Sequence, residues 1–188
     1  FINFFLCLII FRIMSSNNIV FSSFFEIPYS FLPLLILFIS GIINDIKGMK
    51  TINKILIQLL VSFFLVNANI QLFEGDSIII LLINIMFFMG TINTINLIDG
   101  LDGLAALLSI IYCAAFFSLF YLINQFEYIN LFIVYIITVM SLISFLYYNL
   151  KYKSIFLGDT GSLLLGLLFS ISIIYLTKSL NFKNDFLL

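Results

Sequence analysis

SIIILLINIMFFMGTINTINLI, at residues 77–98, contains no charged side chain and runs directly into DGLDG at residues 99–103. A helix that crosses a membrane needs about 20 consecutive, mostly apolar residues. Backbone N–H and C=O groups find no water in lipid, so such a segment pairs them internally and forms a helix. We therefore expect a membrane-crossing helix here that ends in a polar, glycine-containing turn.

The composition of the whole chain supports the same class of protein. Of the 188 residues, 63% are hydrophobic and 9% are charged, whereas a soluble domain carries about 25% charged residues. This balance excludes a soluble enzyme, a disordered chain and a nucleic-acid binder with a basic patch. The apolar runs are too long for transmembrane β-strands, which alternate over about ten residues. The sequence therefore predicts an all-α fold, a polytopic transmembrane helical bundle in a lipid bilayer.

Six or seven apolar segments are separated by short polar connections. We expect a partial span over residues 1–14 and six further spans over about 29–43, 52–66, 77–98, 104–123, 129–148 and 158–176. The chain begins inside an apolar run, and its tail stops without a recognisable ending. We therefore expect residues 1–188 to form a single integral membrane domain, a fragment that is incomplete at both ends.

The acidic clusters are predicted to share one side of the membrane. Two spans separate Asp45 from Asp99, and two separate Asp102 from Asp159, so each time the chain returns to the same side. Five of the eight basic residues fall on that side: Lys47, Lys50, Lys54, Lys151 and Lys153. Because basic residues are enriched in cytoplasmic loops, we expect a multi-pass protein of the cell (inner or plasma) membrane whose acidic face is cytoplasmic.

These four aspartates are the main candidates for chemistry. Each lies at a span end beside a glycine or a polar neighbour. Carboxylates so close to the hydrocarbon region are costly to desolvate and tend to mark function. Several of them around one point attract Mg²⁺, or Mn²⁺ in its place. Mg²⁺ takes one or two carboxylates and completes its shell with water and phosphate oxygens.

Other residues add groups that suit phosphate. Residues 158–162, GDTGS, open a helix, where free backbone N–H groups can receive phosphate oxygens. Lys54 can neutralise further phosphate charge. The chain contains no histidine, which excludes histidine-based catalysis within these residues. Together these features indicate phosphoryl transfer, in which catalysis is mostly positioning and charge stabilisation.

Each candidate also has a purely structural interpretation. Asp159 suits the N-cap position of the helix that follows it. Asp99 and Asp102 suit a solvated turn between two helices. Asn44 and Asp45 suit the C-terminal turn of a helix, and for this pair taken alone the structural interpretation is favoured. The functional interpretation depends on all of them lying on one face.

Two motifs resemble signatures of the polyprenyl-phosphate N-acetylhexosamine-1-phosphate transferases. They are NTINLIDGLDGLA at residues 93–105 and FLGDTGSLLLG at residues 156–166. GIIND at residues 41–45, followed by Lys54 and Gln58, is similar to a third motif of that family, with an asparagine where its first acid usually stands. The resemblance covers about residues 41–166. Apart from any such role, Asn93 and Asn96 lie one helical turn apart and suit hydrogen bonds to neighbouring helices.

The resemblance implies a reaction and its partners. A polyprenyl phosphate, usually undecaprenyl phosphate, attacks the β-phosphate of a UDP-N-acetylhexosamine and releases UMP, with Mg²⁺ required. This is the first step of a cell-envelope glycan pathway, at the cytoplasmic membrane face. The motifs do not specify the sugar, the prenyl length or an oligomeric state.

The resemblance also implies roles for individual residues. It places the metal on Asp159 and Asp99. The residues implied in catalysis are Asp45, Asp99 and Asp102. The residues implied in substrate binding are Asn44, Lys54, Asn96, Asn149 and Phe156, the last two near the nucleobase. An amide cannot act as a base. Asn44 therefore keeps open the alternative that the chain is a catalytically silent homologue or fragment.

Two other classes remain as alternatives. Asp99, Asp102 and Gly103 match the opening of the CDP-alcohol phosphotransferase motif, although Leu107 stands where that motif has arginine. A transporter fragment with a cytoplasmic cation site explains the carboxylates but leaves the two glycine-rich motifs unexplained.

Overall fold

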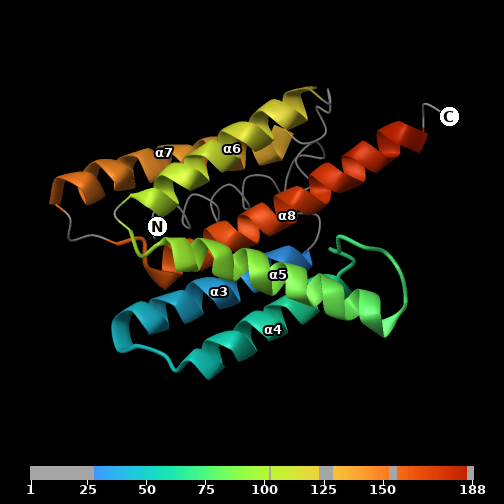
Figure 1. The fold of residues 1–188 in the computed structure, drawn as a ribbon, viewed down its shortest axis with the longest axis horizontal. Coiled ribbons are helices and arrows are strands. Elements are labelled where there is room, and N and C mark those ends of the chain that lie inside the picture. The colour runs from blue at the N-terminus through green and yellow to red at the C-terminus, as the bar shows by residue number, and fades with distance from the viewer. Residues whose placement is uncertain (1–27, 102, 123–128, 153–155, 186–188) are drawn as a thin grey trace. The chain divides into compact units, whose positions relative to one another are not determined.

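The described part of the chain is entirely helical. The computed structural model describes residues 28–101, 103–122, 129–152 and 156–185 (Figure 1). Its helices are α3 (Pro28–Lys47), α4 (Thr51–Asn67), α5 (Ile78–Ile98), α6 (Leu104–Leu122), α7 (Ile129–Tyr152) and α8 (Gly158–Asp185). Within these ranges there is no strand, which confirms the all-α prediction. The six helices cover the six segments that were expected to be spans after residue 28. The expected span over residues 1–14 lies outside the described residues.

Four of the described helices are long and apolar enough to cross a membrane. They comprise Ile78–Ile98, Leu104–Leu122, Phe132–Tyr152 and Gly158–Leu180. At a rise of about 1.5 Å per residue, about 20 residues cover the hydrocarbon core. Helix α4 is apolar but shorter. Four such helices are typical of a multi-pass membrane protein.

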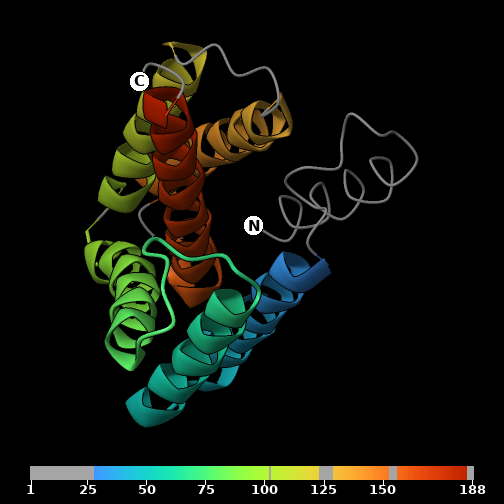
Figure 2. The same ribbon diagram turned by 90° about the vertical axis from the view of Figure 1, so that its right-hand side faces the viewer.

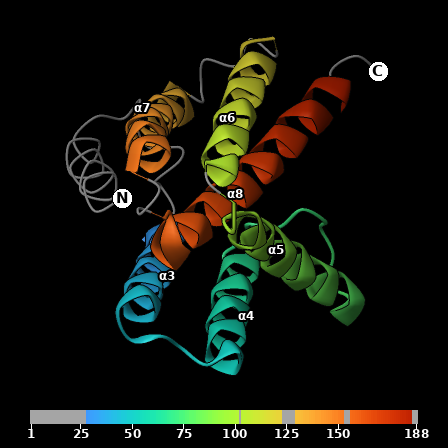
Figure 3. The ribbon, with the colours of Figure 1, turned by 60° about the vertical axis from the view of Figure 1, so that its left-hand side comes forward.

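The helices divide between two compact units. Helices α3, α4, α5 and α8 form the four-helix unit, and α6 and α7 belong to the other. Inside the four-helix unit, α5 packs against both α4 and α8. Figures 2 and 3 both show α5 beside α8, and Figure 3 shows the short turn that joins α3 to α4. In the α6–α7 unit, the Phe116 ring stacks on the Tyr135 ring, with centroids 6.0 Å apart.

Two glycines let the backbones of the four-helix unit approach closely. A Cβ added to Gly166 in α8 would lie 2.6 Å from the Cα of Ile92 in α5. A Cβ added to Gly41 in α3 would lie 2.5 Å from the Cα of Thr160 in α8. Small residues are what allow such crossings in membrane proteins. These two contacts fix the first turns of α8 against α3 and α5, which is where the candidate site lies.

Candidate functional site

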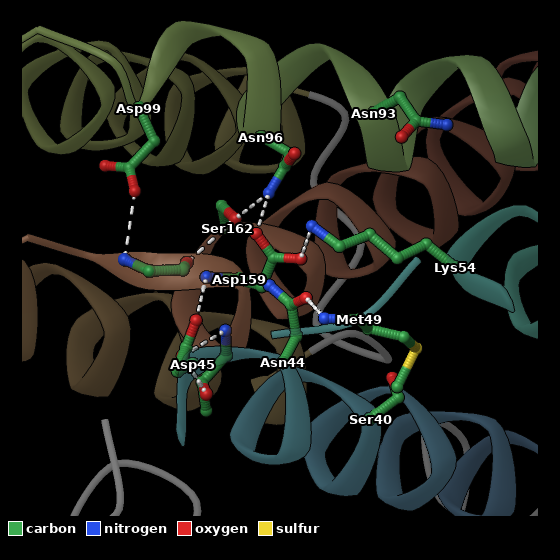
Figure 4. Close-up of polar contacts among 12 residues, drawn as sticks. Ser40, Asn44, Asp45, Met49, Lys54, Asn93, Asn96, Asp99, Asp159 and Ser162 are labelled. Atoms are coloured by element: carbon green, nitrogen blue, oxygen red, sulfur yellow. Dashed lines mark hydrogen bonds and ion pairs between the residues drawn. The ribbon is translucent and has the colours of Figure 1, made fainter. Parts of the chain in front are cut away.

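Asp159 connects three helices at the start of α8. Its Oδ1 accepts a hydrogen bond from Asn96 Nδ2 of α5 at 2.8 Å, and its Oδ2 lies 2.5 Å from the Lys54 ammonium of α4 (Figure 4). The side chains of Lys54 and Asp159 are only 27% and 14% exposed. A pair this sheltered is screened less by water and salt than a surface ion pair. The site is therefore built around a carboxylate held by one amide and one ammonium group.

Asn96 also fixes the helical turn that carries Asp159. Its Nδ2 donates a second hydrogen bond to Ser162 Oγ at 2.9 Å, and Ser162 Oγ donates to the carbonyl of Gly158 at 2.9 Å. The predicted role of Asn96 in bonding to a neighbouring helix is confirmed. The sequence analysis did not predict that Ser162 accepts a hydrogen bond from Asn96. The available signal was its place one helical turn after Asp159, which puts both side chains on the same face of α8.

The first N–H groups of α8 are occupied by aspartates from other helices. The N–H of Gly158 donates to Asp99 Oδ2 at 2.9 Å, and the N–H of Asp159 donates to Asp45 Oδ1 at 2.9 Å. The N–H of Thr160 donates to Asp45 Oδ2 at 3.0 Å. Helix N-terminal N–H groups lack intrahelical partners and favour negative charge. The prediction that they are free to receive phosphate oxygens is therefore wrong for these three residues.

These contacts show how the predicted aspartates come together. Asp45 and Asp99 both contact the first residues of α8, beside Asp159, as expected for carboxylates grouped around one point, and their predicted roles in catalysis and metal binding stay predictions. Asp159 is not the N-cap of α8, because it lies inside the first turn and its carboxylate points to Asn96 and Lys54. Asp102 lies outside the described residues, so its place in this cluster stays a prediction.

Asn44 closes the C-terminal end of α3. Its carbonyl accepts the N–H of Gly48 at 2.8 Å, and its Oδ1 accepts the N–H of Met49 at 2.8 Å. Gly48 has a φ of 71°, the left-handed conformation that commonly ends a helix. The structural interpretation of Asn44 is thus confirmed, and its predicted role in substrate binding is untested by these contacts.

Asn149 and Phe156 belong to the α6–α7 unit. The Asn149 side chain is buried, and its Oδ1 would lie 3.5 Å from a Cβ added to Gly103. Phe156 is 60% exposed. Their predicted location near a nucleobase stays a prediction.

A reciprocal amide pair links α4 to α5 near the site. Gln58 Nε2 of α4 donates to Asn93 Oδ1 of α5 at 3.1 Å, and Asn93 Nδ2 donates to Gln58 Oε1 at 2.7 Å. Gln58 is 2% exposed, so an unpaired amide here would be costly. This pair confirms that Asn93 bonds to a neighbouring helix, and it holds α4 in register so that Lys54, one turn earlier, reaches Asp159.

A small cavity of about 10 Å³ lies beside the ion pair. Its lining includes Ser40, Asn44, Met49, Lys54, Gln58 and Asp159. A cavity of this size holds about one water molecule. Leu37, Ile57 and Leu163 complete the lining, so the space beside Lys54 and Asp159 is small and of mixed polarity, and a sugar nucleotide does not fit inside it.

The donor set fits a magnesium ion that arrives with a substrate. Among the described residues, no group of three or more Asp, Glu, Cys or His side chains is placed to hold a metal. Mg²⁺, however, usually binds through one or two carboxylates together with substrate phosphates. The buried Oδ2 of Asp159 already faces a cation, the Lys54 ammonium. Asp159, together with Asp99 at the same helix end, therefore has the chemistry that such an ion needs.

Comparison with known proteins identifies the family. A family model described as glycosyl transferase family 4 matches residues 27–177, a range that contains every site residue named above. A comparison with curated proteins found no match.

Proposed function

Because the chain belongs to glycosyl transferase family 4, we propose that it transfers N-acetylhexosamine-1-phosphate from a UDP-sugar to a polyprenyl phosphate. The observation that carries the proposal is the cluster at the start of α8, where Asp159 meets Lys54 and Asn96 at the end of membrane helices. Acceptor and donor differ in solubility, so their reaction requires a site at the membrane surface. We place that site on the cytoplasmic face of the cell membrane, as the distribution of lysines favours.

The proposed reaction is a displacement at phosphorus. An oxygen of the polyprenyl phosphate forms a bond to the β-phosphorus of the UDP-sugar, and the bond from this phosphorus to the bridging oxygen of UMP breaks. UMP leaves with that oxygen. The products are UMP and a polyprenyl-diphosphate sugar, so every phosphate is accounted for.

The residues of the four-helix unit have distinct roles in this proposal. The Lys54 ammonium moves from Asp159 to the diphosphate and stabilises the charge that develops on the leaving group. Asp159 and Asp99 would hold a magnesium ion, which would supply positive charge to neutralise the phosphate oxygens. Asn96 keeps the Asp159 carboxylate oriented throughout, because it bonds to Oδ1 and not to the oxygen that faces Lys54.

No protein base is needed for this step. A phosphate monoester has a second pKa near 6, so at neutral pH the acceptor is already mostly ionised. The amide of Asn44 cannot take a proton, and its Oδ1 is used in the turn after α3. An asparagine at this position is therefore compatible with activity.

A reconstitution assay tests the proposal. The chain is purified in detergent and incubated with UDP-N-acetylglucosamine, undecaprenyl phosphate and Mg²⁺, and UMP is measured. We expect UMP release that requires both the lipid and the metal. UMP release without the lipid would indicate hydrolysis, and CMP release from a CDP-alcohol would indicate the other phosphotransferase class. Either result, or no release from any donor sugar, would overturn the proposal.

A further inference from the structure

Asp45 contacts α8 through both of its carboxylate oxygens. Oδ1 accepts the N–H of Asp159 at 2.9 Å. Oδ2 accepts the N–H of Thr160 at 3.0 Å and the hydroxyl of Thr160 at 2.5 Å. A residue at the end of α3 thereby satisfies two of the N–H groups that a helix leaves without partners at its start. In most helices such a cap comes from the residue directly before the helix.

The chain leaves space for this carboxylate. Gly158 has a φ of 68°, and a Cβ at this position would lie 2.7 Å from Asp45 Oδ2. One turn before Asp45, a Cβ at Gly41 would lie 2.5 Å from the Cα of Thr160. The absence of a side chain at Gly41 and at Gly158 thus leaves the room that the Asp45 carboxylate needs to reach the start of α8.

We propose that Asp45 is a positioning residue, which caps α8 from α3 and thereby holds Asp159 toward Lys54. It does not act as a base or as a metal ligand. The inference depends on the proposed function for its effect on catalysis. Its physical basis is that the backbone of Asp159 is held by Asp45 while its carboxylate is held by Asn96 and Lys54. Without Asp45, the N–H groups of Asp159 and Thr160 lose their partner, and the start of α8 keeps the contacts of Asp99 with Gly158 and of Asn96 with Asp159 and Ser162.

Kinetic measurements on substitutions at Asp45 test this role. Asp45→Asn keeps one oxygen acceptor for Thr160, so we expect kcat for UMP release to fall by no more than about tenfold, with the pH dependence of kcat unchanged. Asp45→Ala removes the cap, and we expect a loss of about 100-fold, the effect of a misplacement of about 1 Å. Thr160→Val should lower kcat less, and adding it to Asp45→Ala should cause little further loss.

A different pattern of rates is expected if Asp45 acts as a general base. Removal of a general base costs about 10² to 10⁴ in rate, and asparagine replaces it no better than alanine. If Asp45→Asn loses as much as Asp45→Ala and its pH dependence changes, Asp45 acts in the chemistry and the positioning role is refuted.

Hydrogen exchange gives a readout that does not depend on activity. The backbone amides of Asp159 and Thr160 should exchange at least tenfold faster in Asp45→Ala than in the wild-type protein. Asp76→Asn, a change in the exposed loop between α4 and α5, is the matched control and should leave this exchange unchanged. Equal exchange in Asp45→Ala and wild type would overturn the inference. A wild-type protein that releases no UMP would instead refute the proposed function, and the exchange result would still test the cap.

Discussion

Replacement of Gly166 by alanine should separate α5 from α8 and disable the site. The new Cβ would lie 2.6 Å from the Cα of Ile92 and 2.9 Å from its carbonyl oxygen, which are backbone atoms that no side-chain rotation relieves. Carbon atoms pack best at about 3.5–4.0 Å, so the helices must separate by roughly 0.9 Å. Overpacking of this kind costs about 1–3 kcal/mol of unfolding free energy.

The effect on the site follows from the position of Asn96, one turn after Ile92 on α5. Its Nδ2 lies 2.8 Å from Asp159 Oδ1. A displacement of roughly 0.9 Å would lengthen this contact beyond the range of about 2.7–3.2 Å for an N–H···O hydrogen bond. Misplacement of a catalytic group by about 1 Å lowers the rate by about 100-fold. We expect Gly166→Ala to release UMP about 100-fold more slowly.

Gly90→Ala is the matched control for this prediction. Gly90 lies on α5, and a Cβ there would meet nothing within 4 Å. Alanine is the better helix former by about 0.5–1 kcal/mol, so this variant should be at least as stable as wild type and equally active. Both variants are compared by thermal unfolding in detergent and by UMP release. If Gly166→Ala matches Gly90→Ala in both measurements, the close helix crossing does not position the site.

Three further predictions concern the polar contacts of the four-helix unit. Gln58→Leu should lower the free energy of unfolding by about 1–3 kcal/mol, because it leaves the Asn93 amide without its partner. In a double-mutant cycle, Gln58→Leu/Asn93→Leu should lower this free energy by less than the sum of the two single changes. Asn84→Ala removes hydrogen bonds to Leu72, Phe73 and Ile80, so proteolysis in the loop before α5 should become faster while the rate per folded molecule stays unchanged. Lys54→Met should lower kcat by about 100-fold, because the charge that develops on the leaving group loses its ammonium partner. It should also tighten Mn²⁺ binding in the absence of substrate, because no ammonium then competes for Asp159. An unchanged Mn²⁺ titration by electron paramagnetic resonance would contradict this.

The helices were predictable because lipid leaves the backbone few choices. A long apolar run must satisfy its own hydrogen bonds, so residues 78–98 were predictable as a helix from composition and length alone. Counting spans then predicted only that Asp45, Asp99 and Asp159 lie on the same side of the membrane, whereas their meeting at the start of α8 is seen in the fold. Both steps depend on the spacing of polar interruptions, which the sequence displays directly.

The individual partners were not predictable, because they depend on how closely the backbones pack. Lys54 was expected to meet phosphate, and with no substrate its ammonium group meets the Asp159 carboxylate instead. The α8 N–H groups were expected to be free, yet Asp45 reaches them because Gly41 and Gly158 remove the side chains that would block it. A glycine in the sequence signals close approach, but the residue that approaches it is known only from the fold.

The rate of UMP release by Asp159→Asn tests the central claim most directly. Asparagine has nearly the shape of aspartate and keeps an oxygen for Asn96, but it loses the charge that faces Lys54. With saturating UDP-N-acetylglucosamine, undecaprenyl phosphate and Mg²⁺, we expect a rate about 10² to 10³ times lower than wild type, and an intact fold by thermal unfolding. A rate within a factor of about three of wild type would show that the chemistry does not take place at the start of α8.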